Sequence, residues 1–448
     1  MTTYCPGTPH YPRLARRAHD QRSQLAALYG AIDFDAEPHR FTTDPTVEST
    51  LPRWVAERAP ILADDRLVEL IRTATLLGDV IADPYAALAQ RYTVAELIDM
   101  LRRACRSGID SVVDAPPELR TFLAAMEATP PWIDLRLVEE GARYSRLATA
   151  LLAPFLARGA FLATFLNTYA ALPMALTGAL SGRRAARRVN ETAGFFTVTT
   201  LPGALTRHGA GFEAAAMVRL MHSLVRYHAL THPEQWDHRV YGVPVPQIDQ
   251  VPAGLVDIYL LAMSAARRGR TEFGARERAM LEFSRYRCFL LGLPEELLPT
   301  TATGVIELLH ARAALLRDGF DDATCGALVR STMSAYLRPG RSWFDRAADA
   351  VERSWSRAFF LGFCGGNRKQ AAGMSVGFGI ADAARVLVTA PFILGRFLAV
   401  LAAGRWSVLR DRVDEYTIGL VRARLTTYGV PEFTAEVRDP VSAHRHTP

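Results

Sequence analysis

The sequence predicts an all-α protein, built as one large helical domain with an extension at each end. Apolar residues recur at helical spacing from about residue 60 to residue 429, and no stretch of more than a few residues alternates as a strand would. With 448 residues, 49% hydrophobic and 22% charged, the chain can bury a large core. No glycine- or serine-rich linker divides its middle, so we expect one domain rather than the two or three that length alone suggests.

Charge and cysteine content argue against several classes of protein. The net charge of +6 comes almost wholly from arginines scattered along the helices, which is not the pattern of a nucleic-acid-binding protein. The five cysteines stand far apart without a C-x-x-C pair, so they give neither a zinc site nor a disulfide framework. Because their number is odd and the N-terminus has no apolar leader, we expect a cytoplasmic protein, with contact to a membrane left open.

Four regions follow one another along the chain. Residues 1–50 are rich in Pro, Thr and Asp, with one helix at residues 11–28, and are expected to form an arm laid over the main domain. Residues 51–120 carry helical patterns separated by proline turns and are predicted to be accessory packing helices. Residues 120–360 form the main helical domain, and residues 361–448 contain helices, an apolar run and a polar tail.

An arginine-rich helix opens the most unusual stretch of the domain, at residues 184–232. Two arginines, a hydroxyl and an aromatic ring fall on one face of this helix, at Arg184, Arg188, Thr192 and Phe195. The loop at residues 201–203 ends the helix. A second helix then begins near Gly211.

The second helix carries a histidine at the edge of a wide apolar face. Arg219, Ser223 and Arg226 occupy the narrow remaining side, which leaves His222 pointing towards the interior rather than towards water. A lone imidazole in such a place is more often a core histidine bonded to a carbonyl than a ligand. A neutral imidazole on a rigid helix among Met, Leu and Val nevertheless suits a haem iron, which needs a nitrogen ligand inside an apolar pocket.

Other histidines offer competing sites. His310 lies on a later helix and is a second candidate for a haem ligand, with a structural role as the alternative. His228 and His232 form an i, i+4 pair, which is a geometry for zinc or non-haem iron. Pro233 ends their helix at once and no carboxylate stands at a completing distance, so exposure at a helix end explains this pair equally well.

The spacing of three of these residues resembles a known motif. Arg188 and Thr192, followed thirty residues later by His222 with a Pro-Gly loop between, resemble the haem-binding motif of the MpaB-type and latex-clearing (rubber) oxygenase family. Further segments resemble the family in the same order, over roughly residues 120–360: residues 130–134, 241–250 and 287–294.

The resemblance implies a haem-binding oxygenase catalytic domain at residues 120–360, with globin-like helical packing around a haem. It implies that His222 is the axial ligand of a b-type haem, and that Arg188 and Thr192 line the oxygen-binding side. The implied reaction uses dioxygen to cleave or oxygenate a carbon–carbon double bond in an apolar isoprenoid or terpenoid substrate. A haem carrier or sensor that kept the fold and lost the chemistry is the alternative.

Two departures from the family pattern concern the chemistry. Rubber-cleaving members carry a lysine just before the motif threonine, but this chain has Glu191 there, and Lys369 is its only lysine. A lysine-capped resting iron is therefore not expected. The run at residues 159–180, where rubber oxygenases carry a catalytic acid, contains no Asp or Glu. Glu191 is then the nearest candidate for proton transfer, with an ordinary solvated helix residue as the alternative.

Two apolar runs are long enough to meet a membrane. The run at residues 159–180 contains Asn167 and is expected to be a buried central helix. The run at residues 386–403 is interrupted by Pro391 and Arg396, which favours interfacial attachment or burial over a clean span. We therefore predict peripheral contact with a membrane through the second run.

Overall fold

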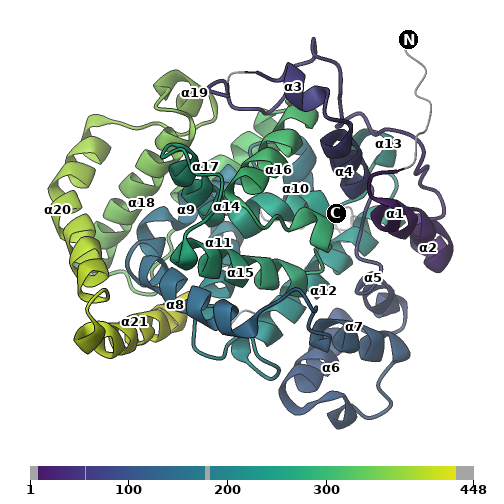
Figure 1. The fold of residues 1–448 in the computed structure, drawn as a ribbon, viewed down its shortest axis with the longest axis horizontal. Coiled ribbons are helices and arrows are strands. Elements are labelled where there is room, and N and C mark those ends of the chain that lie inside the picture. The colour runs from purple at the N-terminus through teal and green to yellow at the C-terminus, as the bar shows by residue number, and fades with distance from the viewer. Residues whose placement is uncertain (1–8, 56, 177–181, 430–448) are drawn as a thin grey trace, which may run out of the picture.

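Helices make up nearly all the regular structure of the computed structural model, which describes residues 9–55, 57–176 and 182–429 (Figure 1). Within these ranges, strand-like pairing is limited to two isolated bridges, Phe41 with Leu316 and Ser49 with Arg317. The all-α prediction is confirmed.

The N-terminal helices pack against the middle of the chain rather than forming a separate unit. The segment between α2 and α3 runs extended along the end of α16, where Thr42 N donates to Leu315 O (2.9 Å) and Thr50 N donates to Leu316 O (3.0 Å). The helices of this part are α1 (Pro12–Gln24), α2 (Ala26–Tyr29), α3 (Ala59–Leu62), α4 (Asp65–Thr75), α5 (Asp83–Ala87), α6 (Val94–Ser107) and α7 (Pro117–Glu127).

The central helices surround α14 and α15, which lie in the middle of Figure 1. In this part α8 packs along α15, α14 lies between α15 and α16, and α12 packs against α5 and α6. The helices are α8 (Leu135–Leu151), α9 (Ala153–Ala163), α10 (Thr168–Leu176), α11 (Gly182–Val198), α12 (Ala210–Thr231), α13 (His238–Tyr241), α14 (Gln247–Ala266), α15 (Ala275–Leu290), α16 (Ala302–Leu315) and α17 (Ala327–Ser334).

Helix α11 takes part in two apolar cores. The larger core is formed by α4 to α7, α12 and α14 to α16, and Phe195 near the end of α11 belongs to it. The smaller core lies among α9, α10, α17 and α18, and Ala185 and Val189 belong to it. Since both ends of α11 are anchored in this way, the arginine and hydroxyl side chains between them are held on a fixed helix.

The expectation of one buried central helix at residues 159–180 is wrong. Helix α9 ends at Ala163, and α10 begins only at Thr168. Asn167 stabilises the break between them, because its Oδ1 accepts from Tyr169 N (2.9 Å) and its Nδ2 donates to Arg317 O (2.9 Å). These bonds favour a turn over continued helix. Residues 177–180 of the run lie outside the described residues.

The C-terminal helices form the outer edge of the molecule, on the left of Figure 1. They are α18 (Trp343–Phe363), α19 (Arg368–Gly373), α20 (Ile380–Ala403) and α21 (Ser407–Tyr428). Pro391 lies inside α20 without ending it. Helix α20 packs on α18 and α8, yet no part of its most apolar window is buried. The alternative that this run is a core helix is therefore wrong.

Few helices of the described chain are both long enough and apolar enough to cross a membrane. Helix α20 is the single helix there that could cross a bilayer by these criteria, and α8 with α9 would qualify only as one sharply bent pair.

Candidate active site

The helix pair expected around residues 184–232 is present as α11 and α12, and His222 lies in the middle of α12. The imidazole Nδ1 of His222 lies 3.1 Å from Oε1 of Gln250 on α14. Gln250 Nε2 in turn donates to Gln247 Oε1 (2.7 Å), and Gln247 Nε2 donates to the carbonyl of Gly78 (3.1 Å). These four residues form a continuous relay of hydrogen bonds.

The relay fixes the tautomer of His222. A backbone carbonyl can only accept, so Gln247 must donate to Gly78, Gln250 must donate to Gln247, and Nδ1 of His222 must donate to Gln250. The proton of the neutral ring is then on Nδ1, and Nε2 carries a lone pair. Within the described residues, Nε2 has no hydrogen-bond partner, so this nitrogen is free to bind a metal.

Burial keeps the His222 ring uncharged. Desolvation, with the nearby Arg226 charge adding to it, lowers the pKa of His222 from 6.5 to about 4, although Gln250 opposes the shift. The side chain nevertheless keeps part of its surface accessible. A neutral, partly accessible imidazole with an open nitrogen has the properties of a metal ligand.

The side of α12 that carries Arg219, Ser223 and Arg226 is buried, whereas His222 is partly accessible. Arg219 pairs with Asp79, where Nη2 donates to Oδ1 (2.9 Å), and Arg226 pairs with Asp83, where Nε donates to Oδ2 (3.0 Å). Arg226 and Asp83 are fully buried. The prediction that the two arginines lie on the outer side of the helix and leave His222 pointing away from water is therefore wrong, because distant carboxylates bury the arginines.

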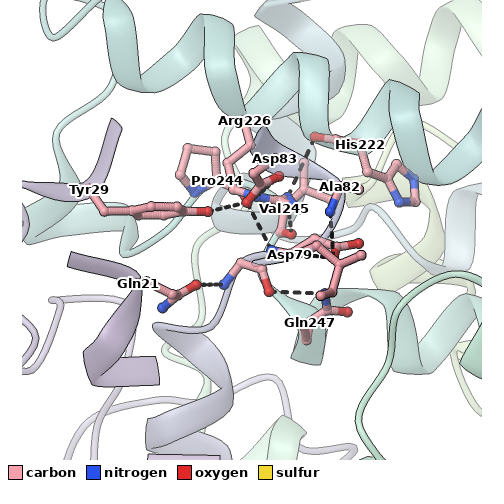
Figure 2. A network of polar contacts seen from close by, with 12 residues as sticks. Gln21, Tyr29, Asp79, Ala82, Asp83, His222, Arg226, Pro244, Val245 and Gln247 are labelled. Atoms are coloured by element: carbon pink, nitrogen blue, oxygen red, sulfur yellow. Dashed lines mark hydrogen bonds and ion pairs between the residues drawn. The ribbon is translucent and has the colours of Figure 1, made fainter. Parts of the chain in front are cut away.

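These ion pairs belong to a polar network behind the histidine (Figure 2). Tyr29 donates to Asp83, and Arg226 Nη1 donates to the carbonyls of Pro244 (3.2 Å), Val245 (3.0 Å) and His222 (3.5 Å). Figure 2 shows the His222 ring pointing away from this network. The network therefore holds the backbone of α12 while the imidazole stays available on the other side.

Charge is balanced inside the network. Burial raises the pKa of the Asp79 carboxyl, but Arg219 and Arg226 outweigh it and bring the pKa to about 2. Burial and then Asp83 raise the pKa of Tyr29 well above 10. Asp79 is therefore a carboxylate and Tyr29 a neutral hydrogen-bond donor at all physiological pH values.

Helix α11 places Arg188 near the histidine. The positive charge of Arg188 is among those that lower the pKa of His222, and burial lowers the pKa of Arg188 itself. Thr192 follows one turn later and is partly accessible. The structure thus brings the α11 arginine predicted from the sequence into the electrostatic surroundings of His222.

Glu191 is not an ordinary solvated residue, because its side chain is only 12% exposed. Its Oε1 lies 3.0 Å from Nε of Arg187, and its Oε2 lies 3.8 Å from Nη1 of Arg188. Both carboxylate oxygens are thus engaged by arginines, which suits Glu191 to positioning Arg188.

The competing histidines have other partners. His310 Nε2 lies 2.9 Å from the Tyr259 hydroxyl, and its ring packs edge-on against Trp54. His232 Nδ1 lies 2.8 Å from the carbonyl of His228. In the ranges described, no group of three or more His, Cys, Asp or Glu side chains is placed to hold a metal ion.

The single lysine lies at the surface. Lys369 is exposed on α19, which packs against α18. The four described cysteines, Cys105, Cys288, Cys325 and Cys364, are buried and free.

Sequence reasoning missed the residues that surround the ligand candidate. Gln247 and Gln250 lie within a segment that already resembled the family, but their contact with His222 was not anticipated. Asp79 and Asp83 were not singled out either. One signal was available for the two aspartates: Asp79 and Asp83 are four residues apart, and two arginines on an otherwise apolar helix need carboxylate partners.

Comparison with known proteins places this site in a family. Residues 142–393 match the family model described as ER-bound oxygenase mpaB/B'/Rubber oxygenase, catalytic domain. The solved structure of latex clearing protein in the closed state is similar, with a TM-score of 0.54 and 18% identity over 79% of this chain and 91% of that chain. At that identity the likeness shows the fold alone. No curated protein matches the sequence significantly. Since the family match spans more than half of the 448 residues, the chain belongs to the mpaB and rubber oxygenase family, and it is an oxygenase.

Proposed function

We propose that this oxygenase depends on haem b, with iron bound by Nε2 of His222, and that it acts with dioxygen on an apolar isoprenoid alkene. The observation that carries the proposal is the relay from Gly78 through Gln247 and Gln250, which places the ring proton on Nδ1 and leaves an Nε2 lone pair on a partly accessible ring. A metal ligand needs an unprotonated nitrogen that a cofactor can reach.

The residues fit a haem. A metal-binding imidazole commonly donates its second N–H to a fixed acceptor, as His222 does to Gln250. Val218 and Val225, one turn from His222 on α12 and partly accessible as it is, supply an apolar surface, and Arg188 is a cation for a propionate or an oxygen ligand. When bound, haem would supply dioxygen binding and the oxidation that side chains cannot perform.

The protein's own residues have distinct parts in this proposal. His222 holds the cofactor, Gln250 sets the ring orientation, and Arg188 and Thr192 offer hydrogen-bond donors from α11. Glu191 keeps Arg188 in place through their ion pair. The buried apolar side chains exclude water, which strengthens each of these electrostatic contacts.

The substrate class follows from the relatives and from the apolar surroundings. The family and the similar structure are named for rubber and latex, which are isoprene polymers. We propose cleavage or oxygenation of a carbon–carbon double bond in an isoprenoid or terpenoid by this chain.

Haem is tested first by an absorption spectrum of the purified protein, with and without dithionite and carbon monoxide. A Soret band is expected in the wild type and in His310→Ala, and its loss is expected in His222→Ala. Retention of haem by His222→Ala together with its loss in His310→Ala would transfer the ligand role to His310.

Oxygenation is tested by oxygen consumption with a panel of isoprenoids and by labelled dioxygen, whose oxygen should appear in a carbonyl product. Haem-replete protein that never consumes oxygen would favour a carrier or sensor instead. The pairing of Glu191 with two arginines, where a free acid was expected, is the observation that supports this second candidate.

We also propose that α20 attaches the enzyme to a membrane surface. Its outer face presents large apolar side chains, among them Ile380, Leu387 and Phe392, the last two 76% exposed. Arg385 and Arg396 are exposed beside this face, as in helices that lie in the interfacial plane.

The attachment is tested with point variants because α21, which follows α20, packs on α8 and α11 and pairs Asp414 with Arg146. A truncation would therefore damage the core. Leu387→Ser with Phe392→Ser should reduce flotation with phosphatidylcholine vesicles by at least tenfold, since each buried apolar side chain contributes about 1.5–3 kcal/mol. Unchanged flotation would refute attachment through α20.

A further inference from the structure

A basic cavity lies at the end of α20, remote in sequence from the α11–α12 pair. Its volume is about 320 Å³, and its walls come from α8, α15, α21 and the turn between α20 and α21. This volume is at the lower end of the range for small-molecule sites, roughly 300–1,000 Å³, and easily holds a phosphate group.

Four arginines line this cavity: Arg143, Arg276, Arg405 and Arg410. The one lining carboxylate, Asp414, already pairs with Arg146, which is itself buried. Arg143 lies 3.9 Å from Glu140. The other three lining arginines lie within ion-pair distance of no carboxylate in residues 9–55, 57–176 and 182–429.

Arg276 and Arg143 are held in place by an aromatic ring. The guanidinium of Arg276 lies 4.7 Å from the centroid of Tyr144, and that of Arg143 lies 5.0 Å from the same centroid. The Tyr144 hydroxyl donates to Glu140 (2.7 Å), which fixes the ring. Burial lowers the pKa of Arg276; Tyr144 opposes this shift, and the charges of Arg405 and Arg143 add to it. These charges repel one another, and an anion would relieve the repulsion.

The apolar surface of α20 continues to the same place. Trp406, next to Arg405, is 70% exposed, and Val408 at the start of α21 is 85% exposed. Tryptophan is enriched at the level of lipid headgroups, where one part of the ring is apolar and the other wet. A bilayer touched by α20 and Trp406 would therefore present its headgroups beside the cavity.

We propose that this cavity binds the phosphate of an anionic phospholipid in the bilayer that α20 contacts. The inference rests on the proposed membrane attachment. Planar guanidinium groups bind phosphate oxygens in pairs, and several around one cavity give a site for a single phosphate group. Basic pockets next to membrane helices are known to bind such headgroups. The site would orient the enzyme on the membrane and favour anionic surfaces.

The test compares flotation of the full-length protein with vesicles of phosphatidylcholine alone and vesicles that also contain phosphatidylglycerol. The wild type should prefer the second. Arg276→Gln with Arg405→Gln should bind the anionic vesicles about thirty-fold more weakly, the factor for two arginines at about 1 kcal/mol each. Binding to phosphatidylcholine alone should not change.

Two matched variants separate a built site from general charge. Arg267→Gln with Arg268→Gln removes the same charge from exposed arginines at the end of α14, and should have little effect. Arg276→Lys with Arg405→Lys keeps the charge but loses the planar fork, and should bind the anionic vesicles more weakly than the wild type and more tightly than the glutamine pair. If the pocket glutamine pair unfolds, Arg405→Gln with Arg410→Gln, at exposed positions, replaces it.

Vesicle binding by the wild type separates the headgroup site from attachment through α20. Equal binding to both kinds of vesicle would overturn the headgroup site but remain consistent with attachment through α20. Binding to neither would overturn attachment and the inference together. Full binding by the lysine pair would reduce the site to diffuse electrostatics. If inorganic phosphate binds with the same arginine dependence while the vesicles show no preference, the ligand is a soluble anion and the lipid proposal is wrong.

Discussion

Replacing Gln250 by leucine tests the relay that determines the state of His222. The side chains are similar in size, but leucine can neither accept from Nδ1 of His222 nor donate to Gln247. Two buried polar groups then lose a partner, and leaving a buried donor unsatisfied costs about 1–3 kcal/mol. Removal of the residue that orients a metal-binding histidine lowers metal affinity by about 10–100-fold. We expect both effects in Gln250→Leu.

The affinity is measured by titrating haem into the apoprotein, and the stability by urea unfolding of the same preparation. Gln250→Glu is the second variant, because a carboxylate still accepts from Nδ1 of His222 and makes the imidazole more basic. It should retain haem and lower the reduction potential of the iron relative to the wild type. Gln370→Leu, at an exposed position on α19, is the control for a generic glutamine substitution.

A purely structural role for Gln250 would lower stability without moving the potential. The reasoning is therefore wrong if Gln250→Leu binds haem as tightly as the wild type, or if Gln250→Glu leaves the potential unchanged. It would also be wrong if the Gln370→Leu control lost as much affinity as Gln250→Leu.

Three further predictions concern pH, the buried ion pairs and the α11 residues. Burial lowers the folded-state pKa of His222 from 6.5 to about 4, so the unfolded chain binds a proton first as the pH falls. The unfolding free energy of the apoprotein should therefore decline as the pH falls from 6.5 to about 4. Haem affinity should stay level until the pH approaches about 4. A haem titration with a midpoint near 6.5 would contradict this. Asp83→Asn leaves Arg226 buried without its partner and should lower the unfolding free energy by about 3–5 kcal/mol in urea, whereas Asp322→Asn in the exposed pair with Arg330 should change nothing measurable. Arg188→Ala and Thr192→Ala should slow oxygenation of an isoprenoid by about 10²–10⁴-fold with the Soret band intact, and Glu191→Gln should have a milder effect; loss of the band in either alanine variant would move that residue from chemistry to cofactor binding.

The features predicted correctly are those that depend on neighbouring residues along the chain. Helical periodicity predicts α11 and α12, and the placement of His222 on the apolar side of α12 needs only that helix. The all-α class follows because such patterns persist through the described chain. Local spacing is sufficient in these cases, since a helix brings i and i+4 together whatever surrounds it.

The partners of those residues could not be predicted in this way. Arg219 lies 140 residues from Asp79 in the sequence, and Arg226 lies 143 residues from Asp83. Helical periodicity shows that both arginines lie on one side of the helix, but it cannot show whether their guanidinium groups are hydrated or paired with a distant carboxylate. The same limit hid Gln250, which reaches His222 from a separate helix.

The two apolar runs show how single side chains decide between similar sequences. Residues 159–180 resemble α20 in composition, yet Asn167 lies at a break in that run, where its side chain bonds to the backbone of Tyr169 and of Arg317. In α20, Pro391 interrupts the apolar sequence but not the helix. A proline removes only one hydrogen-bond donor from a helix, and α20 continues through Pro391. An asparagine whose side chain has two backbone partners stabilises a turn instead, and the helix does not continue through Asn167.

Hydrogen bonds connect α1 and α2 of the N-terminal arm to the residues that hold His222. Gln21 on α1 accepts from Gly78 N (2.7 Å), and the carbonyl of the same Gly78 ends the relay that begins at His222. Tyr29 on α2 donates to Asp83, which pairs with Arg226 beneath the histidine. An arm that merely covered the domain would not contribute to both networks. The residues that fix the tautomer and backbone of His222 are thus anchored in turn by the first two helices, so the proposed metal binding at Nε2 would depend on order in the arm.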